Sequence, residues 1–167
     1  MKRMLPVFLA VMVISGTAMA DYINVYTDAS GNSCVLASGF TSTATVIEKF
    51  SLGTTGSHFK IEFPAGTIFY GFNTSFVPTG VLTSDLSLAY GQCLVGDIPL
   101  GAIVADLAPG LIYVLPPDTF SVITSTDCNF VDHTAYGWHA YVDMEGPCAE
   151  PLAATPSTWG SVKALYR

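Results

Sequence analysis

Apolar and polar residues alternate along most of this chain with a period of two. Between residues 57 and 64, for example, Phe59, Ile61 and Phe63 are separated by polar residues. This spacing is typical of a β-strand that turns one face to a core and the other to water. Nine runs of this kind are bounded by Gly, Pro, Asp or Ser, and they cover residues 22–27, 44–50, 57–64, 67–72, 86–91, 101–108, 110–115, 119–124 and 138–144.

Between these runs there is no amphipathic stretch of helical period. Parallel neighbouring strands usually need a crossover helix, and the short spacers leave no room for one. We therefore predict an all-β fold, an antiparallel β-sandwich of the jelly-roll or immunoglobulin/cohesin-like type, formed as a single domain by residues 21–148.

The first twenty residues have the pattern of a secretory signal peptide. Lys2 and Arg3 precede an apolar run over residues 5–14, and Ala18 and Ala20 stand where a signal peptidase recognises its substrate. No later stretch is apolar and long enough for a transmembrane helix. We expect cleavage near Ala20 and a mature protein without a transmembrane segment, secreted or located at the cell surface or in the periplasm.

The charge of the mature chain is strongly negative. Without the signal peptide it has four basic residues against thirteen acidic ones, a formal net charge of −9, and two of the four basic residues lie in the last five positions. Such a surface repels phosphate backbones, which excludes nucleic-acid binding. With 50% hydrophobic and 11% charged residues, the chain has enough apolar surface to form a core.

Four cysteines, Cys34, Cys93, Cys128 and Cys148, lie in the mature part. An even number in an exported chain predicts disulfides, and no pair has the close spacing of a zinc site. Three connectivities are possible and the sequence does not decide between them. We favour Cys93 with Cys128 and Cys34 with Cys148.

Asp28, Ser30 and Asn32 are spaced like the first oxygen ligands of a calcium loop, with Gly31 among them. The other ligands of such a loop are missing, because the next carboxylate is that of Glu48. These residue types also favour tight turns for local backbone reasons. A turn is therefore the preferred interpretation.

Residues 125–146 hold the densest group of metal-ligating and acid–base side chains: Asp127, Asp132, His133, His139, Asp143 and Glu145. They could build a metal or hydrolytic site. Their spacing matches no catalytic motif, and strand alternation places His139, Tyr141 and Asp143 together on one face. A solvated sheet face is the preferred interpretation, and we predict no metal site.

Aromatic side chains offer a second possible chemistry, because exposed rings on a sheet can stack on sugars. Most are expected to pack in the core or at strand edges. The residues concerned are Tyr70, Tyr90, Tyr113, Tyr136, Trp138 and Tyr141. Asn73-Thr74-Ser75 is formally a glycosylation sequon. The chain has no GxSxG, HExxH or phosphate-binding glycine loop, so we predict no enzyme activity and no cofactor.

After Cys148 the alternation stops. Residues 149–158 contain Pro151 and Pro156 and predict an extended linker. The last residues, 159–167, predict a short helix with one apolar stripe, too short to be stable alone. We expect a docking or sorting tail formed by Trp159, Val162, Lys163, Leu165, Tyr166 and Arg167.

The closing STWGSVKALYR resembles a short terminal tail (Trp-Gly, spacer, Val or Ile, Lys, spacer, Leu-Tyr-Arg) of exported bacterial proteins. The body is similar to a group of uncharacterised secreted bacterial β-sandwich proteins, over residues 23–34, 58–64, 87–94, 125–130 and 146–148. The resemblance implies an envelope or extracellular location and a tail for sorting or surface attachment. It implies no activity.

Together these features predict a secreted or cell-surface interaction or structural module that binds a protein or glycan partner through a sheet face or end loops. A β-sandwich serves many functions, so the fold alone does not identify the ligand. One alternative is a carbohydrate-binding module that uses Trp138 and Tyr141. A less favoured alternative is a metal-dependent hydrolase built on His133 and His139.

Overall fold

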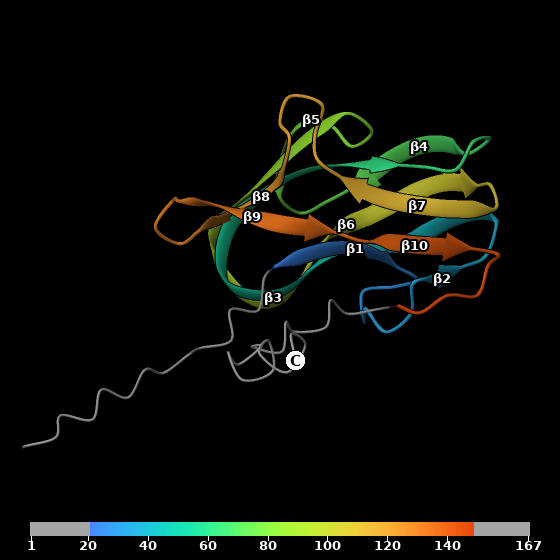
Figure 1. Ribbon diagram of the computed structural model, residues 1–167, viewed down its shortest axis with the longest axis horizontal. Coiled ribbons are helices and arrows are strands. Elements are labelled where there is room, and N and C mark those ends of the chain that lie inside the picture. Colours follow the sequence, from blue (N-terminus) through green and yellow to red (C-terminus); the bar gives the residue numbers. More distant parts are fainter. Residues whose placement is uncertain (1–20, 149–167) are drawn as a thin grey trace, which may run out of the picture. The chain divides into compact units, whose positions relative to one another are not determined.

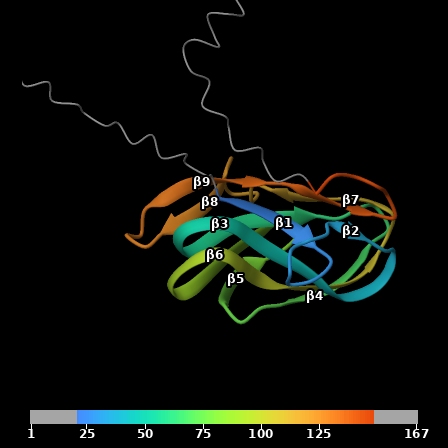
Figure 2. The ribbon, with the colours of Figure 1, turned by 90° about the horizontal axis from the view of Figure 1, so that it is seen from below.

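The structure is a computed structural model that describes residues 21–148 (Figures 1 and 2). The expected signal peptide (1–20), the linker (149–158) and the tail with Trp159, Val162, Lys163, Leu165, Tyr166 and Arg167 lie outside the described residues. Within residues 21–148 the chain forms strands and connecting turns and contains no helix, so no helix there could cross a membrane. The all-β prediction is confirmed.

Residues 21–148 form ten strands, which Figure 1 labels. They are β1 (Tyr22–Tyr26), β2 (Val35–Leu36), β3 (Gly39–Glu62), β4 (Ile68–Asn73), β5 (Val77–Val81), β6 (Asp85–Leu107), β7 (Gly110–Leu115), β8 (Ile123–Asp127), β9 (Asp132–Gly137) and β10 (His139–Val142).

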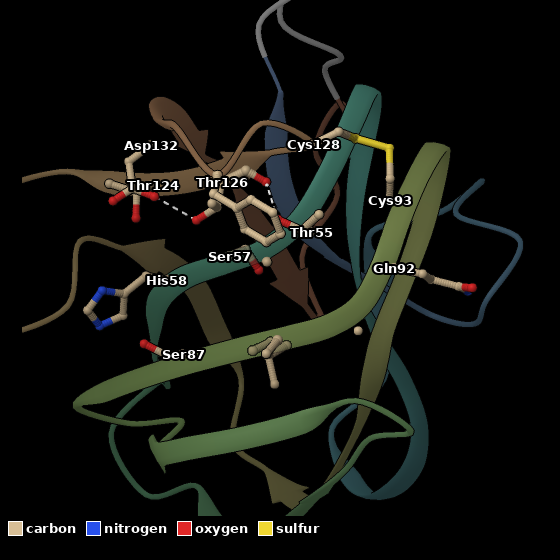
Figure 3. A pocket seen from close by; sticks show the side chains of 15 residues that line it. Thr55, Ser57, His58, Ser87, Gln92, Cys93, Thr124, Thr126, Cys128 and Asp132 are labelled. Atoms are coloured by element: carbon tan, nitrogen blue, oxygen red, sulfur yellow. Dashed lines mark hydrogen bonds between the residues drawn. A yellow bond between two sulfur atoms is a disulfide. The ribbon is translucent and has the colours of Figure 1, made fainter.

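Two long antiparallel strands, β3 and β6, organise the sandwich. The first half of β3 pairs with the second half of β6, from Gly39 opposite Leu107 to Glu48 opposite Ile98. The second half of β3 pairs with the first half of β6, up to Phe59 opposite Leu86. The register shifts repeatedly between these halves, where both ribbons bend (Figure 3). β3 and β6 therefore contribute to both layers.

The remaining strands extend these two halves. β1 pairs with the first half of β3 and β4 with the second half of β6, while β8 pairs with the second half of β3 and β5 with the start of β6. At one end, β7 joins residues 60–62 of β3 to β10, which pairs with β2.

Two short pairings are parallel, β1 with β9 and β2 with β10, whereas we predicted only antiparallel ones. No crossover helix is needed, because most of the sandwich itself lies between the paired strands in the sequence. The argument from missing helices applies only to strands that are close in the chain.

The core lies between the layers and is built from the inward positions of the strands. Its largest fully buried apolar side chains include Tyr22, Phe59, Ile61, Leu100 and Ile112. In residues 58–63 the predicted alternation is confirmed, since Phe59 and Ile61 are fully buried. The six consecutive residues 44–49 are all buried, so both faces of β3 are covered there.

Two disulfides fasten the fold, Cys34–Cys148 and Cys93–Cys128, and no free cysteine occurs in the described range. These are the two pairs that we favoured from the sequence. They indicate folding in an oxidising compartment.

The strand boundaries differ from the prediction in particular places. Strand β5 was not predicted, because it contains Pro78 and Gly80 and these residue types normally interrupt strands. The run at 119–124 was placed too early, since β8 begins only at Ile123 and continues through Ser125 and Thr126. The hydroxyls of these two residues are bonded within the fold, which explains why so polar a segment forms a strand.

Candidate functional site

A groove of about 580 Å³ lies on the outer face of the sheet formed by β3, β6 and β8 (Figure 3). The second half of β3 runs along its centre, between β6 and β8. Its lining is dominated by small and hydroxyl-bearing residues: Thr55, Gly56, Ser57, Ser87, Ala89, Gly91, Thr124 and Thr126. Because these side chains are short, the sheet surface is hollow where larger residues would fill it.

Strand alternation explains how a groove lined by short side chains lies above an apolar core. On β6, Ser87 and Ala89 line the groove, and the intervening Leu88 and the following Tyr90 are buried. Gly56 has a further role, since a Cβ atom there would lie 2.6 Å from the carbonyl oxygen of Leu88. The absence of a side chain lets β3 and β6 approach closely beneath the groove.

One end of the groove is formed by the Cys93–Cys128 disulfide, which ties β6 to the turn after β8 (Figure 3). Phe130 in this turn lines the groove with a ring that is 80% exposed, and its backbone has a positive φ of 62°. The groove therefore combines a floor of short side chains with one exposed aromatic ring at a fixed end.

His58 lies at the other end, away from the disulfide (Figure 3). Its Nε2 atom is hydrogen-bonded to Asp85, which also accepts a bond from the Thr119 hydroxyl. These two bonds lower the pKa of Asp85, and the bond with His58 has the larger effect. The ring of Phe120 packs edge-on against His58 with centroids 5.0 Å apart. The side chain of His58 is thus held in place by neighbours on two segments, the start of β6 and the loop before β8.

Hydroxyl groups fix the side of the groove formed by β8. The Thr55 hydroxyl donates to the carbonyl oxygens of Thr126 and Asp127, at 3.2 and 3.0 Å. The Thr126 hydroxyl donates to Oδ1 of Asp132 on β9 at 2.6 Å. Asp132 is exposed, so a carboxylate stands at this rim. These bonds hold this side of the groove in place, with the carboxylate of Asp132 at its rim.

A buried polar cluster lies beneath the groove. Glu48 is fully buried and accepts hydrogen bonds from the hydroxyls of Tyr90 (2.6 Å) and Ser125 (2.8 Å). Tyr90 is also bonded to Ser57 at 2.7 Å, and Ser125 to Asp21 at 3.2 Å. Burial raises the pKa of Glu48 to about 7, and the two hydroxyl donors offset only part of this effect. Burial also raises the pKa of Asp21.

A second hollow, of about 370 Å³, is lined by Asp21, Asp127 and His133 among others. His133 Nε2 lies 3.1 Å from Oδ2 of Asp127. The pKa of Asp127 is lowered to about 2, mainly by the hydrogen bond from the backbone N–H of Val131 and next by the bond with His133. Asp127 thus behaves as the anchor of the β8–β9 turn, whose backbone it binds at Asn129 and Val131.

The group predicted at 125–146 does not assemble into one site. Asp127, Asp132 and His133 lie at the β8–β9 turn, whereas His139 lies on β10 opposite Tyr113 of β7. Asp143 binds the backbone N–H of Ser38 instead, and Glu145 is exposed. Residues 21–148 contain no cluster of three or more His, Cys, Asp or Glu side chains suited to a metal ion. The hydrolase built on His133 and His139 is therefore not supported.

Asp28, Ser30 and Asn32 form a turn, as we preferred from the sequence. Asp28 accepts hydrogen bonds from Ser30, and Asn32 donates to the Ser30 hydroxyl at 3.0 Å. Gly31 has a φ of 66° and packs against Lys49. Lys49 is nearly buried there, paired with Asp97 at 2.8 Å.

The aromatic residues do not form a flat sugar-binding platform at Trp138 and Tyr141. His139 lies between them in the sequence, stacked on Trp138 at 15° but edge-on to Tyr141 at 73°. Tyr113 is tilted by 52° to His139, and Gly146 packs on the Tyr141 ring. Tyr90 is in the core, Tyr136 and Tyr70 are exposed on separate strands, and Asn73 of the sequon is exposed at the end of β4.

The groove itself was missed by the sequence analysis. Most of its residues are serines, threonines, glycines and other small residues, which are ordinary in any β protein and carry no motif, and of the group at 125–146 only Asp132 lines it. One signal was present, the concentration of these small residues in 54–58, 87–91 and 124–126. Only the pairing of these three segments side by side makes them a surface.

No protein-family model and no curated protein matches the sequence. Among solved structures, the fold is similar to a non-cellulosomal cohesin from the hyperthermophilic archaeon Archaeoglobus fulgidus, with a TM-score of 0.52 and 7% identity over 75% of this chain and 92% of that one. A cohesin module from a family 33 glycoside hydrolase of Clostridium perfringens has a TM-score of 0.49 and 9% identity over 76% of this chain and 99% of that one. The first likeness confirms the predicted β-sandwich fold, for which we named the jelly-roll and immunoglobulin/cohesin-like types.

Proposed function

We propose that this protein is an exported interaction module that binds an extended segment of a protein partner in the groove of β3, β6 and β8. The observation that carries the proposal is the groove itself, an open trough of about 580 Å³ whose floor is made mainly of short side chains, several of which bear hydroxyl groups. Such a surface provides hydrogen bonds and room for side chains of a bound strand.

A protein ligand suits this groove better than a sugar. Phe130 is the single aromatic ring among the lining residues, so two rings cannot stack on successive sugars there. The exposed ring instead provides an apolar anchor beside the disulfide, and Asp132 provides a carboxylate nearby. We infer a partner segment with an apolar side chain for Phe130 and a basic side chain for Asp132. The cohesin-like fold supports an interaction role.

Binding of defined peptides tests this function. Random peptides displayed on phage are selected on the mature protein, and the best are synthesised and measured by calorimetry. Ala89→Arg fills the groove with a long side chain, and Ser42→Arg places the same change at an exposed position on the first half of β3. We expect Ala89→Arg to weaken binding about tenfold or more and Ser42→Arg to leave it unchanged. Equal binding by both variants would contradict the proposal, as would strong binding to a glycan array that Ala89→Arg abolishes.

We further propose that the signal peptide exports the chain and that the tail from Trp159 to Arg167 sorts or docks it at the cell surface. Two basic residues in the tail, Lys163 and Arg167, contrast with the acidic body. In an expressing bacterium, a chain lacking residues 157–167 should be exported and folded but should lose surface retention. Unchanged localisation of the shortened chain would remove the tail from the account.

A further inference from the structure

One stretch of the sandwich edge is uncharged: its strand β5 borders the groove through β6, and its strand β4 pairs with a different part of β6. Residues 63–84 contain no Asp, Glu, Lys, Arg or His, although the chain has thirteen acidic residues. This run of twenty-two residues supplies β4 (Ile68–Asn73) and β5 (Val77–Val81). Both strands are edges, because within residues 21–148 each pairs with β6 alone.

β4 is the less protected of the two edges. Edge strands are usually shielded from further pairing by proline, by charged side chains or by bulges. β5 carries Pro78, whereas β4 has neither proline nor charge. None of the six residues of β4 is buried. A bulge at Tyr70, between Phe69 opposite Ala105 and Gly71 opposite Val104, is the one shielding feature of β4.

Apolar side chains continue from this edge onto the sheet face. Phe40 on β3 and Ile68 on β4 both lie opposite Asp106 of β6, so the three form a row across the strands. Phe40 is 71% exposed, Ile68 54% and Tyr70 59%. The rings of Phe40 and Tyr70 are 6.2 Å apart. Three large apolar groups that contact or neighbour one another at a free edge mark an association surface.

The charge distribution indicates which partner fits. The mature chain has a formal net charge of −9, so two copies repel one another wherever acidic residues face each other. At β4 they meet without a charged side chain on either strand, and the acidic residue of the row, Asp106, lies one strand in from this edge, on β6. Antiparallel pairing about a twofold axis places each β4 against an identical one, which suits an uncharged strand. A cationic partner would instead find acidic side chains in and around the groove, at Asp85, Asp127 and Asp132.

We propose that β4, with Phe40, Ile68 and Tyr70, is a self-association surface at which a second copy of the chain adds its own β4 in antiparallel pairing. The two sandwiches then share one continuous sheet. The groove of β3, β6 and β8 is not part of this contact, so each copy keeps its groove open. The module is thereby bivalent, and binding to a partner with repeated segments is strengthened by the second groove.

Sedimentation of the full mature chain from low micromolar to near-millimolar concentration tests the proposal. We expect a monomer–dimer equilibrium that strengthens as salt is added, because salt screens the repulsion between acidic copies. Tyr70→Glu introduces a charge at the pairing edge and should weaken dimerisation about tenfold or more. Val77→Glu is the matched control, since it makes the same change on the other uncharged edge at a side chain that is 68% exposed.

Hydrogen exchange provides a readout that a folding defect would not imitate. In the wild type, amides of residues 68–73 should become more protected as concentration rises, and those of 77–81 should not. Equal thermal unfolding of both variants shows that the fold is intact. A monomer at every concentration, a dimer that Tyr70→Glu leaves unchanged, or one that Val77→Glu disrupts equally would overturn the proposal. Ala89→Arg in the groove should leave the dimer unaffected, which separates this test from that of the proposed function.

Discussion

The hydroxyl group of Tyr90 donates a hydrogen bond of 2.6 Å to Oε2 of Glu48 in the interior of the sandwich. Glu48 comes from the half of β3 that pairs with β1, and Tyr90 from the half of β6 that lies under the groove. Ser125 of β8 donates to the other oxygen of the same carboxyl group. One buried carboxyl therefore links the two layers at the point where β3 and β6 bend.

This carboxyl predicts a pH dependence of stability. Burial raises the pKa of Glu48 from 4.5 to about 7, so the folded state holds a proton that the unfolded chain releases at lower pH. The stabilisation is complete below pH 4.5 and is lost as the pH rises through about 7. The shift corresponds to a change on the order of 3 kcal/mol in the free energy of unfolding. Denaturant unfolding at a series of pH values measures it.

Glu48→Gln isolates this contribution, because the amide resembles the protonated acid. The variant should lose most of the decline between pH 4.5 and 7 and be more stable than the wild type at pH 8. Asp127, whose pKa is lowered to about 2, acts in the opposite sense. Its contribution is present above pH 3.8 and is lost as the pH falls through about 2. An unchanged slope in Glu48→Gln would show that the buried carboxyl does not control the pH dependence.

Tyr90→Phe should destabilise the protein by about 1–3 kcal/mol, since it removes a donor to Glu48 and leaves buried oxygen atoms without that partner. The same change should raise the pKa of Glu48 further, because the hydroxyl bond normally lowers it. Carbon-13 NMR titration of the Glu48 carboxyl group measures the pKa directly. Tyr70→Phe, at a side chain that is 59% exposed, serves as the control and should change neither quantity. Identical behaviour of the two variants would contradict the role assigned to the Tyr90 hydroxyl.

Gly56→Ala should cost about 1–3 kcal/mol of stability, because the new methyl group meets the carbonyl oxygen of Leu88 and forces β3 and β6 apart. Gly71→Ala makes the same change in β4, where a Cβ atom has no neighbour within 4 Å. The unfolding temperature of Gly71→Ala should equal that of the wild type or lie slightly above it. A thermal unfolding series compares the two, and equal losses would refute the close approach of the strands at Gly56.

Removing the Cys34–Cys148 disulfide should destabilise the fold more than removing Cys93–Cys128. The first closes a loop of 114 residues and the second one of 35, so their effects on the entropy of the unfolded chain are about 5 and about 4 kcal/mol. Paired Cys→Ser variants in denaturant unfolding give the order. The Cys93/Cys128 variant should also bind groove peptides more weakly, because this disulfide forms one end of the groove. Full peptide affinity without it would contradict that role.

The sequence predicted the fold class because the signal is local and repeated. Alternation in residues 57–64 and 138–144 reports which face of each strand is buried, and the structure keeps Phe59, Ile61, Ala140 and Val142 in the core. The polar strand β8 and the proline-containing β5 could not be found in this way. Their strand conformation depends on partners distant in the sequence, such as Glu48 for Ser125 and β6 for β5.

The candidate site could not be predicted from the sequence for a related reason. Thr55, Ala89 and Thr124 have no distinctive chemistry alone, and they form a groove only because three segments pair in a particular register. The side chains that did attract attention, His133 and His139, have separate structural neighbours. Of the reactive residue types noted in the sequence, only Asp132 lines the groove.

NMR chemical-shift mapping of the isotope-labelled mature protein with a selected peptide tests the central claim most directly. The account predicts the largest shifts in residues 55–58, 87–92 and 124–132, with contacts between the peptide and the ring of Phe130. Shifts confined to the Trp138–Tyr141 region or to the outer face of β4, with the groove residues unmoved, would contradict it.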